Sequence, residues 1–304
     1  MHYKVSVLMT TYNHEKFIAQ AVSSVLEQKV DFPYELVVGE DCSTDRTRDI
    51  LCGFQAEYPE TIRLLLREEN WGRRKNFIDT FKSCQGEYIA ILEGDDYWIS
   101  RQKLQRQADF LDSHPECSIC FHPVMKRNQD GDESLEFHGP SPSRAFYTIE
   151  DLLERPLIVT CSVMFRNHLF GDFPPWFHSV PAGDWPLNIL NAQHGHIGYI
   201  DEAMAVYRMH SGGVWSSKTS IRRLQGKLEI LKTLRQHLDP KYKRKLDDSI
   251  AQAHLRIIAA LARDRDPKGI YVHLSHMIIT EHVSATSLAS AGLKAIHRRM
   301  RKHG

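Results

Sequence analysis

Short apolar runs alternate with helical patterns through the first hundred residues of the chain. Val5–Met9, Glu35–Val38, Ile62–Leu66 and Tyr88–Leu92 have the length and composition of buried strands, and the residues between them repeat apolar positions at helical spacing. Asn13 is predicted to cap the first intervening helix. This alternation predicts an α/β fold with a mostly parallel sheet between helices.

The pattern beyond residue 100 is less regular. A polar helix is predicted from Arg101 to His114, one strand from Cys117 to Val124, and a second helix over Asp184–Gln193. Asn128–Ser143 is rich in Gly, Pro, Ser and acids and is predicted to be an exposed loop.

Charge divides the chain into two parts. Residues 1–217 contain 20 Lys and Arg against 31 Asp and Glu, a net charge of −11, whereas residues 218–304 contain 19 against 7, a net of +12. The second part also repeats leucine at helical spacing. We therefore expect two domains, an α/β domain over residues 1–217 and a basic helical extension over 218–304.

Composition indicates an ordinary globular protein, since 42% of the 304 residues are apolar and 25% are charged. Six scattered cysteines predict reduced thiols and a cytoplasmic location. Cys117 and Cys120 form a C-x-x-C without a second pair, so core packing is expected rather than zinc or redox chemistry. A strand beginning at Val5 predicts no signal peptide, and the chain has no apolar run of about 18 residues that would span a membrane.

Three carboxylates stand within four residues at the end of a predicted strand. Glu93, Asp95 and Asp96 would repel one another unless a cation neutralises them. Carboxylate oxygens suit Mg²⁺ or Mn²⁺, and Mg²⁺ commonly shares its ligands with substrate phosphates. A solvated acidic turn is the alternative interpretation. The carboxyl ends of strands in an open α/β sheet are also where ligands bind.

Five segments together resemble the successive signatures of family 2 glycosyltransferases, which have the GT-A fold. They are VSVLMTTYN at 5–13, ELVVGEDCSTDRT at 35–47, EYIAILEGDDYW at 87–98, GDWPL at 183–187 and YRMH at 207–210. The resemblance extends from about residue 4 to residue 216. It implies an inverting enzyme that transfers a sugar from a nucleotide-diphosphate sugar, UDP-linked by preference, with Mn²⁺ or Mg²⁺ as cofactor.

The resemblance also implies roles in donor binding. Thr10 and Tyr12 match the end of the first strand, where the family holds the nucleotide base, and Asp41 matches an acid that accepts a hydrogen bond from uracil. Capping the next helix is the alternative role for Asp41. Asp95 is expected to face the ribose or the metal ion.

Metal binding and base catalysis are implied in the same way. Asp96 is favoured for direct contact with the metal ion, and His210 matches a histidine that completes the metal site or touches the diphosphate. Asp184 matches the general base that deprotonates the acceptor hydroxyl. As the first residue of a helix, Asp184 is alternatively a first-turn acid favoured by the helix dipole.

A few nearby residues leave choices open or depart from the family pattern. Arg73, Arg74 and Lys75 either add positive charge near the nucleotide or form a solvated basic turn. Glu40 stands where the family usually has Asp, and Cys42 where it has Gly or Asn. Neither departure is expected to prevent catalysis.

The expected acceptor is a hydroxyl of a glycan or a lipid-linked saccharide, in the assembly of surface polysaccharide, and no nucleic-acid partner is expected. The basic helices of residues 218–304 suit peripheral contact with the anionic inner face of the cell membrane. Packing on an acidic domain of the same chain or of a second copy in a homo-oligomer, or simple solvation, are the alternatives.

Three rival functions can be compared with the sequence. A dinucleotide-dependent dehydrogenase would carry G-x-G-x-x-G after its first strand, and this chain has Thr-Thr-Tyr-Asn-His there. A catalytically inactive nucleotide-sugar-binding or scaffold protein would be expected to lack the base or the metal acids, which are present. A hydrolase that uses water as the acceptor is a related possibility within the glycosyltransferase reading.

Overall fold

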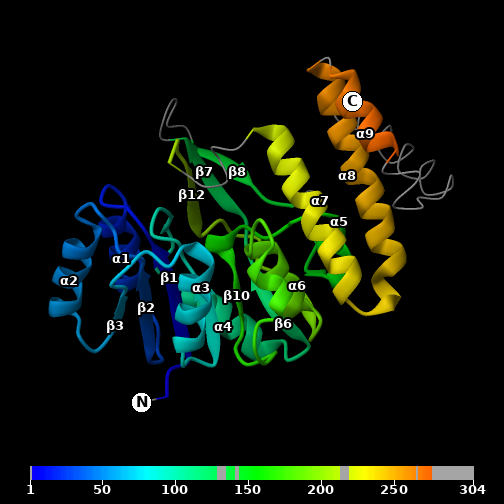
Figure 1. Ribbon diagram of the computed structural model, residues 1–304. Coiled ribbons are helices and arrows are strands. Elements are labelled where there is room, and N and C mark those ends of the chain that lie inside the picture. The colour runs from blue at the N-terminus through cyan, green and yellow to red at the C-terminus, as the bar shows by residue number, and fades with distance from the viewer. Residues whose placement is uncertain (1, 129–134, 141–143, 213–218, 265, 276–304) are drawn as a thin grey trace. The chain divides into compact units, whose positions relative to one another are not determined.

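The computed structural model describes residues 2–128, 135–140, 144–212, 219–264 and 266–275 (Figure 1). The chain forms two compact units. The first comprises residues 1–149, 156–178 and 187–211, and the second comprises residues 150–155, 179–186 and 212–304. The boundary predicted after residue 217 lies within 213–218, outside the described residues, and stays a prediction.

An eight-stranded sheet forms the centre of the first unit. Its strands are β1 (Val5–Thr11), β2 (Tyr34–Glu40), β3 (Ile62–Leu66), β4 (Tyr88–Ile91), β6 (Cys117–Phe121), β9 (Phe146–Tyr147), β10 (Met164–Arg166) and β11 (His196–Tyr199). They lie in the order β3-β2-β1-β4-β10-β6-β11-β9. Only β10 and β9 run antiparallel to their neighbours. The predicted α/β fold with a mostly parallel sheet is therefore confirmed.

Helices pack on both faces of this sheet. Alternate residues of β1 and β2 share one core cluster with α1 (Ile18–Leu26), α2 (Thr47–Glu57) and α4 (Lys103–Ser113). On the opposite face, α3 (Arg73–Ser83) lies against β1 and β2. The approach is close at Gly39, where an added Cβ would stand 2.0 Å from Thr80 Oγ1. Glycine at this position lets α3 pack against the end of β2.

A second sheet contains four strands in the order β5-β12-β7-β8. They are β5 (Tyr97–Trp98), β7 (Val124–Asn128), β8 (Leu135–His138) and β12 (Ala205–Met209). Two predictions were wrong here. The single strand predicted over Cys117–Val124 is two strands in different sheets, separated by His122 and Pro123, and proline cannot donate to a ladder. The loop predicted over Asn128–Ser143 contains β8, which pairs antiparallel with β7.

Each of the six cysteines is a free thiol. Cys117 and Cys120 lie buried on β6, and burial raises the pKa of Cys120 to about 12. The expectation that this C-x-x-C packs in the core is confirmed.

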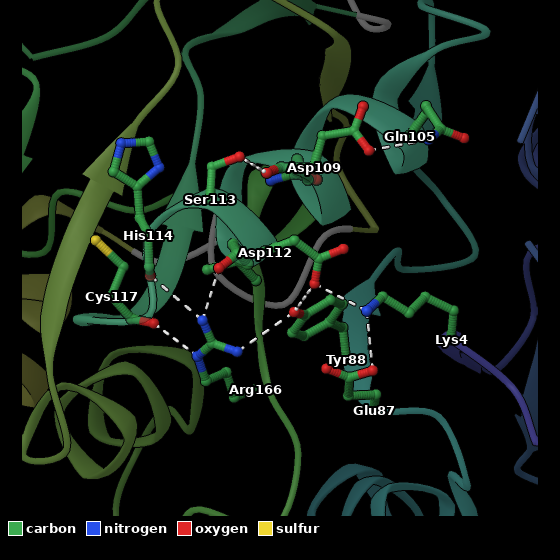
Figure 2. A network of polar contacts seen from close by, with 12 residues as sticks. Lys4, Glu87, Tyr88, Gln105, Asp109, Asp112, Ser113, His114, Cys117 and Arg166 are labelled. Carbon is green, nitrogen blue, oxygen red and sulfur yellow. Dashed lines mark hydrogen bonds and ion pairs between the residues drawn. The ribbon is translucent and has the colours of Figure 1, made fainter. Parts of the chain in front are cut away.

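Charged side chains are paired at the amino ends of β1 and β4 (Figure 2). Lys4 Nζ lies 2.9 Å from Glu87 and 2.8 Å from Asp112, and the Tyr88 hydroxyl donates to Asp112 at 2.5 Å. Arg166 donates to the main-chain carbonyls of residues 111, 114 and 117, so it satisfies the carboxyl end of α4 and the start of β6. This network joins β4, β6, β10 and the residue before β1 to helix α4.

The second unit is largely helical. It contains α5 (Ile149–Glu154), the start of α6 (Asp184–Ala192), α7 (Ser220–His237), α8 (Lys243–Arg263) and α9 (Pro267–Ser275). Three short 3-10 turns complete the described elements, at Thr160–Ser162, Pro175–His178 and Pro240–Tyr242. The helical character predicted for residues 218–304 is confirmed for the described residues, and residues 276–304 lie outside them. Within the described ranges, no helix is long and apolar enough to cross a bilayer.

Candidate active site

Main-chain hydrogen bonds join three loops at the carboxyl ends of β1, β2 and β4. Asp41 N donates to Thr11 O at 3.1 Å, and Gly94 N donates to Thr10 O at 3.1 Å. A Cβ on Gly94 would stand 2.7 Å from Thr11 Oγ1, so the third loop approaches the first too closely for a larger residue. The structure therefore brings the predicted nucleotide-binding residue Thr10 beside the loops of Asp41 and Asp95. Tyr12 follows β1 with 42% of its surface exposed.

Asn13 connects the first loop to the second, and its prediction as a helix cap was wrong. Its backbone has φ +57°, and its Oδ1 accepts from Thr44 N at 2.8 Å while its own N–H donates to Ser43 Oγ at 3.0 Å. Helix α1 begins later, at Ile18, without a side-chain cap. Asparagine tolerates the left-handed region better than most residues, which fits this linking role.

Asp41 is buried and ties down a turn from a distant segment. Its Oδ1 accepts from Trp71 N at 2.8 Å, and its carbonyl accepts from Asn70 Nδ2 at 3.0 Å. Burial raises the pKa of Asp41 above its ordinary value. Asp41 does not cap α2, because Asp45 Oδ1 instead accepts from Thr47 N at 2.9 Å. The alternative predicted for Asp41 is thus excluded, and its role toward uracil stays a prediction.

Two cations lie over the indole of Trp71. Lys75 Nζ is 3.8 Å and the Arg67 guanidinium 4.2 Å from the ring centroid. Arg74 stacks instead on Phe177 at 4.6 Å. Lys75, one of the three basic residues considered from the sequence, therefore contacts the turn held by Asp41.

Glu40 has a structural position in the second loop. Its side chain is fully buried, its Oε1 accepts from Ser43 N at 2.6 Å, and its Oε2 accepts from Arg48 Nε at 2.6 Å. Glu40 keeps the negative charge of the aspartate that is usual in the family, and Arg48 on α2 neutralises this charge.

The three carboxylates of the third loop form a cluster. One oxygen each of Glu93, Asp95 and Asp96 lies within 4.8 Å of the others. His210 Nε2 lies 3.0 Å from Asp95 Oδ2, and His14 Nε2 lies 3.9 Å from the same oxygen. Strand β12 brings His210 there because it pairs with β5, which directly follows the cluster. Burial alone would raise the pKa of Asp95, but the hydrogen bond from His210 and the nearby His14 hold it below its usual value.

Asp96 lies deeper than Asp95. It is 1% exposed, and its Oδ1 accepts from Arg208 N at 2.8 Å. Its Oδ2 is buried and, among the described residues, has no hydrogen-bond partner beyond the weakly donating Cys161 thiol. Burial and the charges of Asp95 and Glu93 raise the pKa of Asp96 well above its ordinary value. A buried carboxylate in this state fits a site that a cation completes.

The donor atoms of this cluster suit a divalent ion. Carboxylate oxygens with one imidazole are a ligand set for Mg²⁺ or Mn²⁺. The sequence favours Asp96 for the direct contact, whereas the structure places Asp95 against His210. Both aspartates thus belong to the candidate site, with Asp95 nearer the histidine.

Sequence reasoning gave no separate role to Arg208 or His14. The Arg208 guanidinium donates to Asp95 O at 2.6 Å, contacts Gln20, and lies 4.3 Å from the centre of the Tyr97 ring. The side chain thus holds the main chain of the carboxylate loop in place. The available signal was its position on β12, two residues before His210, which directly follows that strand, since residues i and i+2 face the same side.

Asp184 is the first residue of α6 and belongs to the second unit. Its side chain is exposed. The Lys227 ammonium on α7 lies within electrostatic reach of its carboxylate. Next to it, Trp185 is 5% exposed and donates from Nε1 to Leu152 O at 2.8 Å, so this tryptophan is a core residue.

Known proteins resemble this chain in both sequence and structure. The sequence profile of Glycosyl transferase family 2 matches residues 6–172. An uncharacterized protein of Mycobacterium tuberculosis is 38% identical over 223 residues, and the match covers 72% of this chain and 62% of that protein. TuaG of Bacillus subtilis, which its name assigns to teichuronic acid biosynthesis as a glycosyltransferase, is 31% identical over 70% of this chain and 82% of its own length.

Two solved structures share the fold. Staphylococcus aureus TarS 1-349 in complex with UDP-GlcNAc matches with a TM-score of 0.56 and 19% identity, over 90% of this chain and 91% of that chain. The mannosyltransferase PcManGT of Pyrobaculum calidifontis, in complex with GDP-Man and Mn²⁺, matches with a TM-score of 0.59 and 18% identity, over 97% of this chain and 88% of its own. The predicted GT-A fold is confirmed, and the chain belongs to glycosyltransferase family 2.

Proposed function

We propose that this protein is an inverting glycosyltransferase. It moves a sugar from a nucleotide-diphosphate sugar to a hydroxyl of a glycan or a lipid-linked acceptor. The observation that supports this most is the joining of the loops of Thr10, Asp41 and Asp95 at one edge of the sheet, with His210 beside them. Such an edge is where open α/β sheets bind ligands.

In the proposed donor site, one group of residues faces the nucleotide base and another group holds the metal ion at the diphosphate. Asp41, held by the 70–72 turn, offers its carboxylate to the base, with Thr10 and Tyr12 at the end of β1. Asp95, Asp96 and His210 would hold Mn²⁺ or Mg²⁺. The ion supplies charge that stabilises the leaving nucleoside diphosphate. A UDP-linked donor is preferred, because an acid at the Asp41 position can accept from the uracil N3–H.

Asp184 acts as the general base in this proposal. As the acceptor oxygen forms its bond to C1 of the sugar, the bond from C1 to the diphosphate oxygen breaks and its electron pair leaves with the phosphate. The hydroxyl proton passes to the Asp184 carboxylate. Attack opposite the leaving group inverts the configuration at C1.

The setting of the reaction is proposed from the relatives. TuaG carries teichuronic acid biosynthesis in its name, and TarS is named a poly(ribitol-phosphate) β-N-acetylglucosaminyltransferase. We place this chain by analogy in surface polysaccharide assembly, at the cytoplasmic side of the cell membrane. Peripheral contact through residues 218–304 and homo-oligomer formation stay predictions.

A screen of nucleotide sugars, read as donor consumption with Mn²⁺ or Mg²⁺ and with excess chelator, tests the proposal. We expect turnover of one donor class with metal and none with chelator. In the Asp184→Asn variant, donor binding should be retained while transfer falls by about 10²–10⁴-fold, the usual contribution of a general base.

Asp264→Asn is the matched control, because Asp264 is exposed at the end of α8 in the same unit. Full turnover in chelator would refute the metal requirement, and wild-type transfer by Asp184→Asn would remove Asp184 from the mechanism. Donor binding without transfer or hydrolysis in the wild-type protein would favour the inactive, nucleotide-sugar-binding alternative.

A further inference from the structure

His14 lies in the first loop, between β1 and α1, and hydrogen bonds of its main chain fix its position. Its N–H donates to Thr47 Oγ1 at 2.8 Å, and its carbonyl accepts from Phe17 N at 2.9 Å and from Ile18 N at 2.8 Å. These bonds connect the residue to the start of α1 and to the first residue of α2. The fold therefore determines where the imidazole of His14 can lie.

The imidazole is held between the first loop and the carboxylate loop, residues 93–96. Its Nδ1 lies 3.1 Å from Thr11 Oγ1. A Cβ on Gly94 would stand 2.9 Å from the same nitrogen, so the ring packs against the main chain of the carboxylate loop. The ring can approach this closely because Gly94 has no side chain.

The other ring nitrogen of His14 lies near the carboxylates. Its Nε2 is 3.9 Å from Asp95 Oδ2, which is too long for a hydrogen bond, whereas His210 Nε2 is 3.0 Å from the same oxygen. Within the described ranges, His14 Nε2 forms no hydrogen bond, and 20% of the side chain is exposed. It is therefore a polar atom of the candidate active site that a ligand can still contact.

The surroundings of the two ring nitrogens favour one tautomer. A lone pair on Nε2 would be repelled by the Asp95 carboxylate, whereas an N–H at this position is attracted to it. The Thr11 hydroxyl then donates to the lone pair of Nδ1. An imidazole that carries its proton on Nε2 has no lone pair there for a metal ion, but it can donate to an anion.

We propose that His14 Nε2 donates a hydrogen bond to the diphosphate of the nucleotide-sugar donor. The inference rests on the proposed function, in which Asp95, Asp96 and His210 hold a metal ion at this diphosphate. A hydrogen bond to a phosphate oxygen is charge-assisted and is stronger than a bond between neutral groups. It would stabilise the negative charge that develops on the leaving nucleoside diphosphate.

Binding of UDP, UMP and uridine to the full-length protein in the presence of Mn²⁺ tests this inference without any need for transfer. GDP, GMP and guanosine form a second series, which is used if the protein binds GDP in place of UDP. His14→Asn keeps a polar group near the position of Nδ1 but removes the donor at Nε2, whereas His14→Gln places an amide N–H near the position of Nε2.

We expect His14→Asn to weaken binding of the nucleoside diphosphate about tenfold and to leave binding of the nucleoside within about twofold of the wild-type value. His14→Gln should restore most of the lost affinity. The nucleoside monophosphate shows which phosphate is contacted, because its binding weakens only if the bond is to the phosphate next to the ribose.

His168→Asn is the matched control. It makes the same substitution at an exposed histidine that follows β10, near the amino end of β4. His168 has φ +58°, a conformation that asparagine tolerates. Its affinity for each nucleotide should equal that of the wild-type protein, and thermal unfolding of each variant shows that it is folded.

Three results would overturn the inference. The first is equal binding of the nucleoside diphosphate by the wild-type protein and His14→Asn. The second is equal weakening of nucleoside diphosphate and nucleoside binding, which would mean that His14 only holds the loops in place. The third is weaker binding of Mn²⁺ by His14→Asn in the absence of nucleotide, measured from the electron paramagnetic resonance signal of the free ion, which would make His14 a metal ligand.

These outcomes are separable from failure of the proposed function. If the wild-type protein consumes a nucleotide sugar but His14→Asn binds the nucleoside diphosphate normally, only the inference fails. If no nucleotide sugar is bound or consumed, the proposed function fails and the inference fails with it.

Discussion

Charged side chains have different surroundings at the two ends of the central sheet. At the amino end, Lys4 lies between Glu87 and Asp112, so one cation is shared by two acids (Figure 2). At the carboxyl end, Asp95 and Asp96 stand beside a third carboxylate, and the imidazoles of His210 and His14 lie 3.0 Å and 3.9 Å from Asp95. The same strands connect both ends, so the contrast reflects what each end does. In the proposed function, the carboxylates at the carboxyl end serve a bound cation, whereas the charges at the amino end serve the fold.

The pKa shifts of Lys4 and Asp96 differ in the same way between the two ends of the sheet. Burial alone would lower the pKa of Lys4, but its bonds to Asp112 and Glu87 raise it, so the ionised state is stabilised. Burial and two neighbouring carboxylates raise the pKa of Asp96, so its ionised state is destabilised. An acid held in that condition costs folding free energy and indicates a binding site.

Replacing Asp95 tests the carboxyl end and should have the largest effect. Asp95→Asn removes one charge from the cluster, and transfer should fall by about 10²–10³-fold because the leaving diphosphate loses its counter-ion. The free energy of unfolding should not fall by more than about 1 kcal/mol, since the lost pair with His210 is offset by relief of repulsion. Activity assays and urea denaturation of the same preparation measure both. Asp109→Asn, at an exposed position on α4, is the control. A large loss of stability with normal transfer would show that Asp95 serves the fold and not the reaction.

Replacing Arg166 tests the amino end and should act on stability alone. Arg166→Met leaves the carbonyls of residues 111, 114 and 117 without their donor, which should cost about 3 kcal/mol of unfolding free energy. Transfer per folded molecule should not change. Arg101→Met is the comparison, because Arg101 forms an exposed pair with Glu27 and should cost at most about 0.5 kcal/mol. Equal midpoints of urea unfolding for both variants would contradict the structural role of Arg166.

Asp112→Asn should give the smallest effect and a characteristic pH dependence. Burial alone would raise the pKa of Asp112, but the hydrogen bonds from Lys4 and Tyr88 hold it below its ordinary value. A depressed carboxyl pKa stabilises the fold above the unfolded value of 3.8, and this contribution is lost as pH falls through the folded pKa. Because Asp112 is largely exposed, the difference from wild type should be about 0.5 kcal/mol at pH 7. It should disappear in acid, and a difference that persists at pH 2 would show that packing, not charge, is responsible.

Local patterns were sufficient to predict the first four strands of the central sheet and the three loops. The strands from Val5 to Leu92 are short and mostly apolar, and each of these three loops directly follows a strand, so period and position carried the information. Asn13 could not be assigned correctly, since the residue that it binds, Thr44, is 31 positions away. The break at Pro123 between two sheets was likewise decided by pairing with distant strands.

Lys103 shows most clearly what the sequence pattern alone could not predict. The helix predicted from Arg101 to His114 reads as polar, yet Lys103 is fully buried, donates to Gln107 at 2.6 Å and lies 4.1 Å from the Trp98 ring. Burial lowers its pKa to about 7. A lysine in a polar helix normally faces water, and only the tertiary position of α4 puts it inside.

The main-chain bonds that join the loops of Thr10, Asp41 and Gly94 have a consequence for protein engineering. A replacement segment that changes the length of one loop would break the bonds on which the others depend, because the loops are joined by main-chain hydrogen bonds as well as through the side chain of Asn13. The three motifs are separated along the chain, but they form one structural unit. Redesign of donor preference would therefore have to exchange side chains within fixed loop lengths or transplant all three loops together.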